Sequence, residues 1–196
     1  MPSATFGNVT GALLLGGHST RMGRDKARLE WQGEAWSTRT AKLLAGIFEE
    51  TLLVGGEPPP DAPGRRVPDP EGPECALRGL VGALEAASCE RVLVVATDLP
   101  LLSEDLLLAL VAWPEQDAVV PVDADGAHPL CAIYRREPSV AVARRRLESG
   151  ALALHGLLDA LATDRVSLDD LGLADLGPAV LTNVNTPDDL ARLGTG

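Results

Sequence analysis

The sequence predicts an α/β fold with three layers, α/β/α, around a mainly parallel central sheet. Short apolar runs of strand length alternate along the chain with longer segments whose apolar residues recur at helical spacing. The chain has 196 residues, of which 45% are hydrophobic and 23% are charged, as in a globular domain with one sizeable core. We therefore expect a single domain over residues 1–196, with residues 1–9 as a flexible N-terminal segment.

The predicted strands are apolar runs that end at glycine, proline or charged residues. The run at 91–96 is apolar after Arg91, and the run at 10–15 ends at the pair Gly16-Gly17. Residues 123–126, Asp-Ala-Asp-Gly, form a turn sequence that joins two further strands. In chain order, we predict strands at residues 10–15, 51–54, 91–96, 117–122, 129–134, 165–168 and 179–181.

The predicted helices carry apolar residues three and four positions apart, so that one face packs on the sheet. The segment 102–113 also has Ser103 as a candidate N-cap, acidic residues in its first turn and Pro114 after its end. Residues 57–73 are rich in proline and glycine, which predicts a long surface loop. In chain order, we predict helices at residues 38–48, 76–87, 102–113, 137–147, 151–162 and 187–193.

Composition excludes several classes of function. The net charge of −11 argues against a nucleic-acid-binding surface, which needs clustered positive charge. The longest apolar runs are far shorter than a membrane span, and the first ten residues lack the features of a signal peptide. Three widely spaced cysteines are typical of reduced thiols. We therefore expect a cytoplasmic protein that binds neither nucleic acid nor membrane.

A glycine-rich loop follows the first predicted strand. Residues 13–26 read Leu-Leu-Leu-Gly-Gly-His-Ser-Thr-Arg-Met-Gly-Arg-Asp-Lys. Glycines let backbone N–H groups approach a phosphate closely, and Arg21 and Lys26 add positive charge. The loop is neither a Walker A motif, since Arg24 follows Gly23 where lysine is required, nor a GxGxxG fingerprint. Composition alone leaves an ordinary surface loop as an equal alternative.

This loop resembles the LxGGxSxRMGxDK signature of nucleotidyltransferases of the molybdenum cofactor guanylyltransferase family. Other segments resemble the family's motifs in the same order: Asp69 in Val-Pro-Asp-Pro, Asp98 in Thr-Asp-Leu-Pro, His128-Pro129-Leu130, and Asn183-Val-Asn-Thr-Pro187. The matches extend from residue 10 to residue 193. The resemblance implies a Rossmann-like nucleotidyltransferase fold in one nucleotidyltransferase domain.

The resemblance also implies which residues bind the nucleotide. Those along the guanine and ribose are Leu14, Leu15 and Gly16, with Asp69 contacting the nucleoside. Those that shape the phosphate loop are Gly17, Ser19, Arg21 and Gly23. Lys26 would neutralise the triphosphate as pyrophosphate leaves. The candidate catalytic residues are Lys26, Arg21 and Asp98.

Asp98 is the candidate metal ligand. It follows the strand at 91–96 at its carboxyl end, where an α/β sheet places its site. One carboxylate there is enough for Mg²⁺, which keeps several waters and takes other ligands from substrate phosphates. The alternative is that Asp98 only caps a turn before Pro100.

Three residues are candidates for binding a pterin substrate. They are His128, Asn183 and Asn185. The two asparagines alternate in sequence, so in an extended segment they point the same way, and amides suit the hydrogen-bonding edge of a pterin. The alternatives are a histidine at the entry to a strand and a capping turn before Pro187.

The reaction implied by the resemblance is transfer of GMP from GTP to molybdenum-bound molybdopterin with release of pyrophosphate. The implied cofactor is Mg²⁺, and transient contact with other cofactor-biosynthesis proteins or molybdoenzymes is expected. The sequence departs from the family at Gly55-Gly56, where an asparagine often stands. Two alternatives stay open: a related nucleotidyltransferase that uses CTP or a sugar-1-phosphate acceptor, and a GTP-binding module without catalysis.

Overall fold

The computed structural model describes residues 5–16, 30–31 and 34–184. Two short strands, β2 (Glu30–Trp31) and β3 (Glu34–Ala35), pair only with each other. The main sheet has eight strands: β1 (Phe6–Leu14), β4 (Phe48–Val54), β5 (Arg65–Val67), β6 (Arg91–Ala96), β7 (Ala118–Asp123), β8 (Gly126–Ala127), β9 (Cys131–Arg135) and β10 (Thr163–Val166). Their order is β10-β7-β9-β6-β1-β4-β5, and β8 pairs with β7.

The sheet is mainly parallel, as the sequence predicts. β1 pairs in parallel with β4 on one side and with β6 on the other. Parallel pairs also join β4 to β5 and β7 to β10. Apart from the short β8, the exception is β9, which runs antiparallel to both β6 and β7. The amino end of β9 therefore lies at the edge where the parallel strands present their carboxyl ends.

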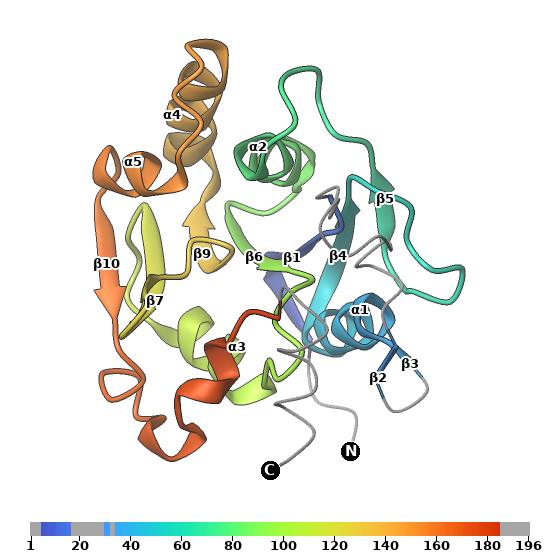
Figure 1. Cartoon of the computed structure of the whole chain (residues 1–196), viewed down its shortest axis with the longest axis vertical. Coiled ribbons are helices and arrows are strands. Elements are labelled where there is room, and N and C mark those ends of the chain that lie inside the picture. The colour runs from blue at the N-terminus through green and yellow to red at the C-terminus, as the bar shows by residue number, and fades with distance from the viewer. Residues whose placement is uncertain (1–4, 17–29, 32–33, 185–196) are drawn as a thin grey trace.

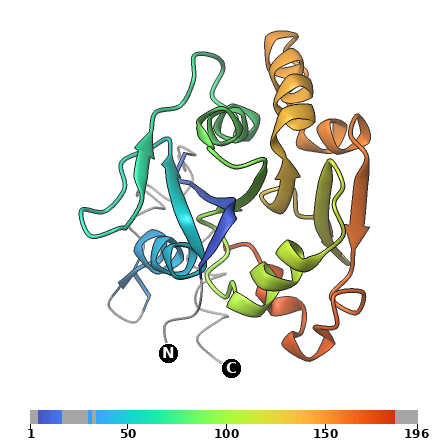
Figure 2. The same cartoon turned by 180° about the vertical axis from the view of Figure 1, so that it is seen from behind.

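Helices cover both faces of the sheet, which gives the three predicted layers (Figure 1). They are α1 (Trp36–Ile47), α2 (Ala76–Ala86), α3 (Glu104–Ala112), α4 (Arg136–Glu148) and α5 (Leu154–Asp159). α1 and α3 lie on one face and α2 and α4 on the other, as the view from behind also shows (Figure 2). Within the part of the chain that the structure describes, no helix is long and apolar enough to cross a membrane.

The first strand begins earlier than the sequence predicts. Residues 6–9, which we expected in a flexible N-terminal segment, form the start of β1. The ring of Phe6 lies 6.4 Å from that of Phe48, centroid to centroid, and Val9 is completely buried. Gly11 makes room for this aromatic contact, because a Cβ atom there would lie 2.6 Å from Cδ2 of Phe48. Packing against Phe48 thus extends the strand toward the N-terminus.

Two predictions of secondary structure are wrong. β5 lies inside the predicted loop 57–73, and its three residues are too few to show a periodic pattern. Residues 179–181 form part of the 3₁₀ helix η3 (Pro178–Leu181) where we predicted a strand. Pro178 at the start of η3 has the fixed φ that favours a helical turn, while Val180 and Leu181 are buried on the α1/α3 side. The predicted helix at 187–193 lies outside the described residues.

Candidate active site

At the carboxyl end of β1, the order in which successive strands are added across the sheet reverses. β1 lies between β4 and β6, and Leu14 is in register with Val54 and Ala96 on these two strands. The chain leaves β1 toward β4 and β5 and later returns to β6 on the opposite side. Such a switch point opens a crevice at the strand ends, which is where α/β sheets bind ligands.

Hydrogen bonding to the sheet continues beyond the end of β1 as far as Leu15, the residue before Gly16. The N–H of Leu15 donates to the carbonyl O of Val54 at 2.8 Å, which continues the pairing beyond the strand. The side chains of Leu14 and Leu15 are buried in the cores on opposite faces, whereas Gly16 is exposed. A nucleotide at this position would therefore meet mainly the backbone of the two leucines.

Asp69 lies against the glycines at the ends of β1 and β4. A Cβ atom on Gly16 would be 3.5 Å from Oδ2 of Asp69. A Cβ atom on Gly55 would be 2.8 Å from both of its carboxylate oxygens, and Gly55 also has a positive φ of 67°. The glycine at position 55 thus provides the space that the Asp69 carboxylate occupies.

Arg78 holds the Asp69 carboxylate in place. Its Nη2 donates to Oδ2 of Asp69 at 3.1 Å, and its Nη1 donates to the carbonyl O of Gly72 at 3.1 Å. Both charged side chains are about one-fifth exposed, at 21% for Arg78 and 20% for Asp69. The pair therefore lies beside the carboxyl ends of β1 and β4.

A pocket of about 130 Å³ lies next to the carboxyl end of β6. Three predicted site residues line it together: Asp98, His128 and Asn183. They come from separate segments, after β6, before β9 and after η3. The segment after η3 is tied to the one after β6, since the N–H of Val184 donates to the carbonyl O of Asp98 at 2.8 Å. Asn183 is thereby brought alongside Asp98.

Cys131 also lines this pocket, and its thiol stays protonated. Burial raises the pKa of Cys131 to about 12, and the negative charge of Asp98 adds to the rise. Tyr134, also completely buried, has its pKa raised by the same loss of solvent and by Cys131. Neither group supplies a nucleophile or a base at neutral pH, so the polar chemistry of the pocket comes from Asp98, His128 and Asn183.

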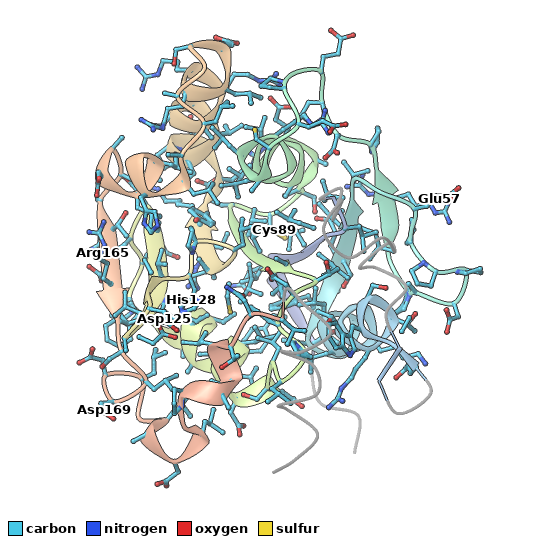
Figure 3. The ribbon with its side chains drawn as sticks, viewed as in Figure 1. Glu57, Cys89, Asp125, His128, Arg165 and Asp169 are labelled. Atoms are coloured by element: carbon cyan, nitrogen blue, oxygen red, sulfur yellow. The ribbon has the colours of Figure 1, made fainter. Side chains whose placement is uncertain are left out.

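His128 is fixed by a carboxylate from the hairpin between β7 and β8. Its Nε2 lies 2.8 Å from Oδ2 of Asp123, and only 10% and 15% of the two side chains are exposed. Figure 3 shows His128 near the carboxyl end of β7, close to Asp125 in the same hairpin. The predicted turn at 123–126 is present between β7 and β8.

Several predicted site residues lie outside the described residues. These are Gly17, Ser19, Arg21, Gly23, Lys26 and Asn185. Of the predicted residues that the structure describes, Leu14, Leu15, Gly16 and Asp69 lie at the ends of β1, β4 and β5. Asp98, His128 and Asn183 lie in the pocket beyond β6.

Sequence reasoning missed two residues of this region, Arg78 and Asp123. Nothing in the sequence around Arg78 shows that it faces Asp69, because the contact spans the loop before α2. Asp123 could have been found by counting along the hairpin. His128 is opposite Pro121, to whose carbonyl O it donates, and Asp123 is two residues from Pro121 on the same face. The sequence alone places Asp123 only in the turn.

Comparison with known proteins shows the family of the chain. Residues 11–165 match the family described as MobA-like NTP transferase domain. The chain is also 34% identical over 200 residues to a probable molybdenum cofactor guanylyltransferase of Chloroflexus aggregans, which covers 95% of this chain and 96% of that protein. The chain belongs to the MobA-like NTP transferase family. As a member, it is a nucleotidyltransferase, which confirms the predicted enzyme class.

Solved structures share the fold of this family member. Molybdopterin-guanine dinucleotide biosynthesis protein A from Archaeoglobus fulgidus aligns with a TM-score of 0.77 at 21% identity, covering 93% of this chain and 95% of that one. The 2-C-methyl-D-erythritol 4-phosphate cytidylyltransferase from Thermus thermophilus aligns with a TM-score of 0.68 at 19% identity, covering 92% and 94%. The predicted nucleotidyltransferase fold is confirmed. Since a cytidylyltransferase shares it, the fold leaves the base unspecified.

Proposed function

We propose that this chain transfers GMP from GTP to the phosphate of molybdenum-bound molybdopterin and releases pyrophosphate. One observation carries the proposal: Asp98, His128 and Asn183, from three distant segments, line one pocket beside the end of β1. The full-length relatives named molybdenum cofactor guanylyltransferase support the choice of substrates. In this proposal the nucleotide lies against the ends of β1 and β4, and the pterin lies in the pocket beyond β6.

The chain's residues would act by position and charge. An oxygen of the acceptor phosphate forms a bond to the α-phosphorus of GTP, and the bond from that phosphorus to the bridging oxygen of pyrophosphate breaks. The acceptor phosphate is already largely ionised at neutral pH, so no strong base is needed. Arg21, Lys26 and the backbone N–H groups from Gly16 to Gly23 would neutralise the leaving pyrophosphate. Asp69 would fix the nucleoside.

The pocket suits Mg²⁺, provided that substrate supplies most of its ligands. Among the residues that the structure describes, no group of three or more histidine, cysteine or acidic side chains could hold a metal ion. Asp98 and Asn183 offer a carboxylate and an amide oxygen, which are ligands of the kind that Mg²⁺ prefers. We propose that Asp98 holds Mg²⁺, which would stabilise charge on the phosphates when bound.

The test is pyrophosphate release with Mg²⁺ and each of GTP, CTP, ATP and UTP, with and without molybdenum-bound molybdopterin. We expect release only with GTP and the acceptor together. Release with CTP would assign the chain to the alternative cytidylyl reaction. Binding of GTP without release under any condition would favour a module without catalysis.

Variants of two aspartates test the part played by Asp98. Asp98→Asn should lower turnover by at least about 100-fold, as expected when a charge that stabilises the transition state is lost. Asp169→Asn is the matched control, because Asp169 is exposed and Figure 3 shows it on an outer loop away from His128. Equal turnover in the two variants would remove Asp98 from the mechanism.

A further inference from the structure

The Asp123 carboxylate is held at both of its oxygens. Oδ1 accepts the backbone N–H of Asp125 at 2.9 Å, which closes the turn. Oδ2 lies 2.8 Å from Nε2 of His128. With 15% of its side chain exposed, the carboxylate has little freedom to turn away from the imidazole.

The backbone around His128 is fixed as firmly as its ring. Its N–H donates to the carbonyl O of Pro121 at 2.9 Å, and its own carbonyl O accepts the N–H of Cys131 at 2.9 Å. The hydroxyl of Tyr134, buried in the core, donates to the carbonyl O of Pro129 at 2.7 Å. Both the position and the ring orientation of His128 are therefore set before any ligand binds.

An ionised carboxylate only accepts hydrogen bonds, so the proton of a neutral imidazole must reside on Nε2. Nδ1 then carries a lone pair and acts as an acceptor. His128 lines the pocket that also contains Asp98 and Asn183, and its Nε2 is taken up by Asp123, so Nδ1 is the ring nitrogen left to meet a ligand there. A ligand group opposite it must donate an N–H or O–H.

We infer that Asp123 is a positioning residue for substrate recognition. It fixes His128 as the Nε2–H tautomer, so that Nδ1 accepts a hydrogen bond from an N–H group of the acceptor's heterocycle. This inference rests on the proposed function, in which the acceptor is a pterin with amino and ring N–H groups. It assigns Asp123 a role in selecting the acceptor.

The decisive variant is Asp123→Asn. The amide has the same shape, and its oxygen retains the hydrogen bond from Asp125. The NH₂ group would then face Nε2 and donate to it, which moves the imidazole proton to Nδ1. The pocket would present a donor where the wild-type protein presents an acceptor. Asp125→Asn is the control, because Asp125 is exposed in the same turn and contributes only its backbone N–H there.

Long-range ¹⁵N–¹H spectra of the full chain at pH 8 report the tautomer without any substrate. We expect protonated Nε2 and bare Nδ1 for His128 in the wild-type protein and in Asp125→Asn, and the reverse in Asp123→Asn. A bare Nε2 in the wild-type protein would overturn the inference.

Equilibrium binding of metal-free molybdopterin and of GTP separates this role from a structural one. Asp123→Asn should weaken molybdopterin binding at least about 10-fold, as expected for an unmade hydrogen bond in a shielded site, and leave GTP binding unchanged. Unchanged molybdopterin binding in a variant whose tautomer has switched would also overturn the inference. Neither measurement requires turnover, so a failure of the proposed reaction would be seen separately, as absent pyrophosphate release.

Discussion

Arg78 of α2 and Asp69 of the loop between β5 and α2 form an ion pair of 3.1 Å. The same arginine also holds the carbonyl O of Gly72, so one side chain fixes both the carboxylate and the loop that carries it. As a result, the carboxylate rests against Gly16 and Gly55 at the ends of two neighbouring strands. Changes to either partner of this arrangement should alter nucleotide binding.

Gly55→Ala should weaken GTP binding about 10-fold. The new Cβ would lie 2.8 Å from both oxygens of Asp69, so the carboxylate must move. The positive φ of 67° adds a backbone cost of about 1 kcal/mol in stability. Gly172→Ala is the matched control, because Gly172 has a φ of 71° and nothing within 4 Å of an added Cβ. Both variants should lose stability in urea titrations. Equal GTP affinity in both would contradict a role for Asp69.

Arg78→Met should lower kcat/KM for GTP by about 10-fold and reduce stability by about 1–2 kcal/mol, since two hydrogen bonds are lost from a partly buried site. Arg165→Met is the comparison, because Arg165 on β10 (Figure 3) forms an exposed ion pair of 2.8 Å with Asp159 at the end of α5. That change should cost less than about 1 kcal/mol and leave kinetics unaltered. Matching kinetic profiles for the two variants would show that Arg78 does not position Asp69.

The carboxylate of Glu50 should make the free energy of unfolding depend on pH in the acid range. Burial opposes its ionisation, but hydrogen bonds from Thr10, Ser88 and Arg65 outweigh this and lower the pKa from 4.5 to about 2. A lowered pKa stabilises the fold above the unfolded-state value of 4.5, and the contribution disappears as pH falls toward 2. At neutral pH it is on the order of 2 kcal/mol once solvent screening is included.

The variant Glu50→Gln tests this contribution in urea titrations at pH 7, 4 and 3. Wild type should be more stable at pH 7, and the difference should shrink as the pH falls. Glu71→Gln is the control, because Glu71 is exposed in the loop before α2. A difference that stays constant over this range would show that the Glu50 charge does not contribute.

Cys131 should resist alkylation in the native protein. Its thiol is completely buried, and burial together with the charge of Asp98 raises its pKa to about 12. Cys75 and Cys89 are partly exposed and should react with iodoacetamide first at pH 8. Peptide mass spectrometry measures the order, with the protein unfolded in guanidinium as the reference in which all sites react. Early labelling of Cys131 would mean that the pocket floor opens in solution.

The sequence predicts the architecture well because the strongest elements have clear apolar patterns. β6 has the predicted bounds, and Ser103 caps α3 by accepting the N–H of Leu106 at 3.3 Å, as expected. β5 was missed because three residues carry no period, and its pairing with β4 is a tertiary contact. The strand predicted at 179–181 was wrong because a short run of buried apolar residues fits a short helix as well as a strand.

The sequence singles out those candidate-site residues that lie in a family motif. It does not single out those that depend on contacts made only in the folded structure. Asp69, Asp98, His128 and Asn183 follow from the family resemblance. The structure places Asp69 at the ends of β1 and β4, and the other three in one pocket. Arg78 and Asp123 contact two of those residues, Asp69 and His128. Their importance depends on which atoms meet across a loop and a hairpin, and that information is not contained in any local pattern.

The reversed direction of β9 has a consequence for how this sheet can diversify. Along a purely parallel sheet, every residue that reaches the ligand edge follows a strand and precedes a crossover helix. Here, the segment that contains His128 reaches that edge just before β9 begins. This segment is separate in sequence from the glycine-rich loop that follows β1. Under the function that we propose, acceptor preference and nucleotide preference are therefore encoded in separate segments of the gene, and each is free to change by substitution without rebuilding the other.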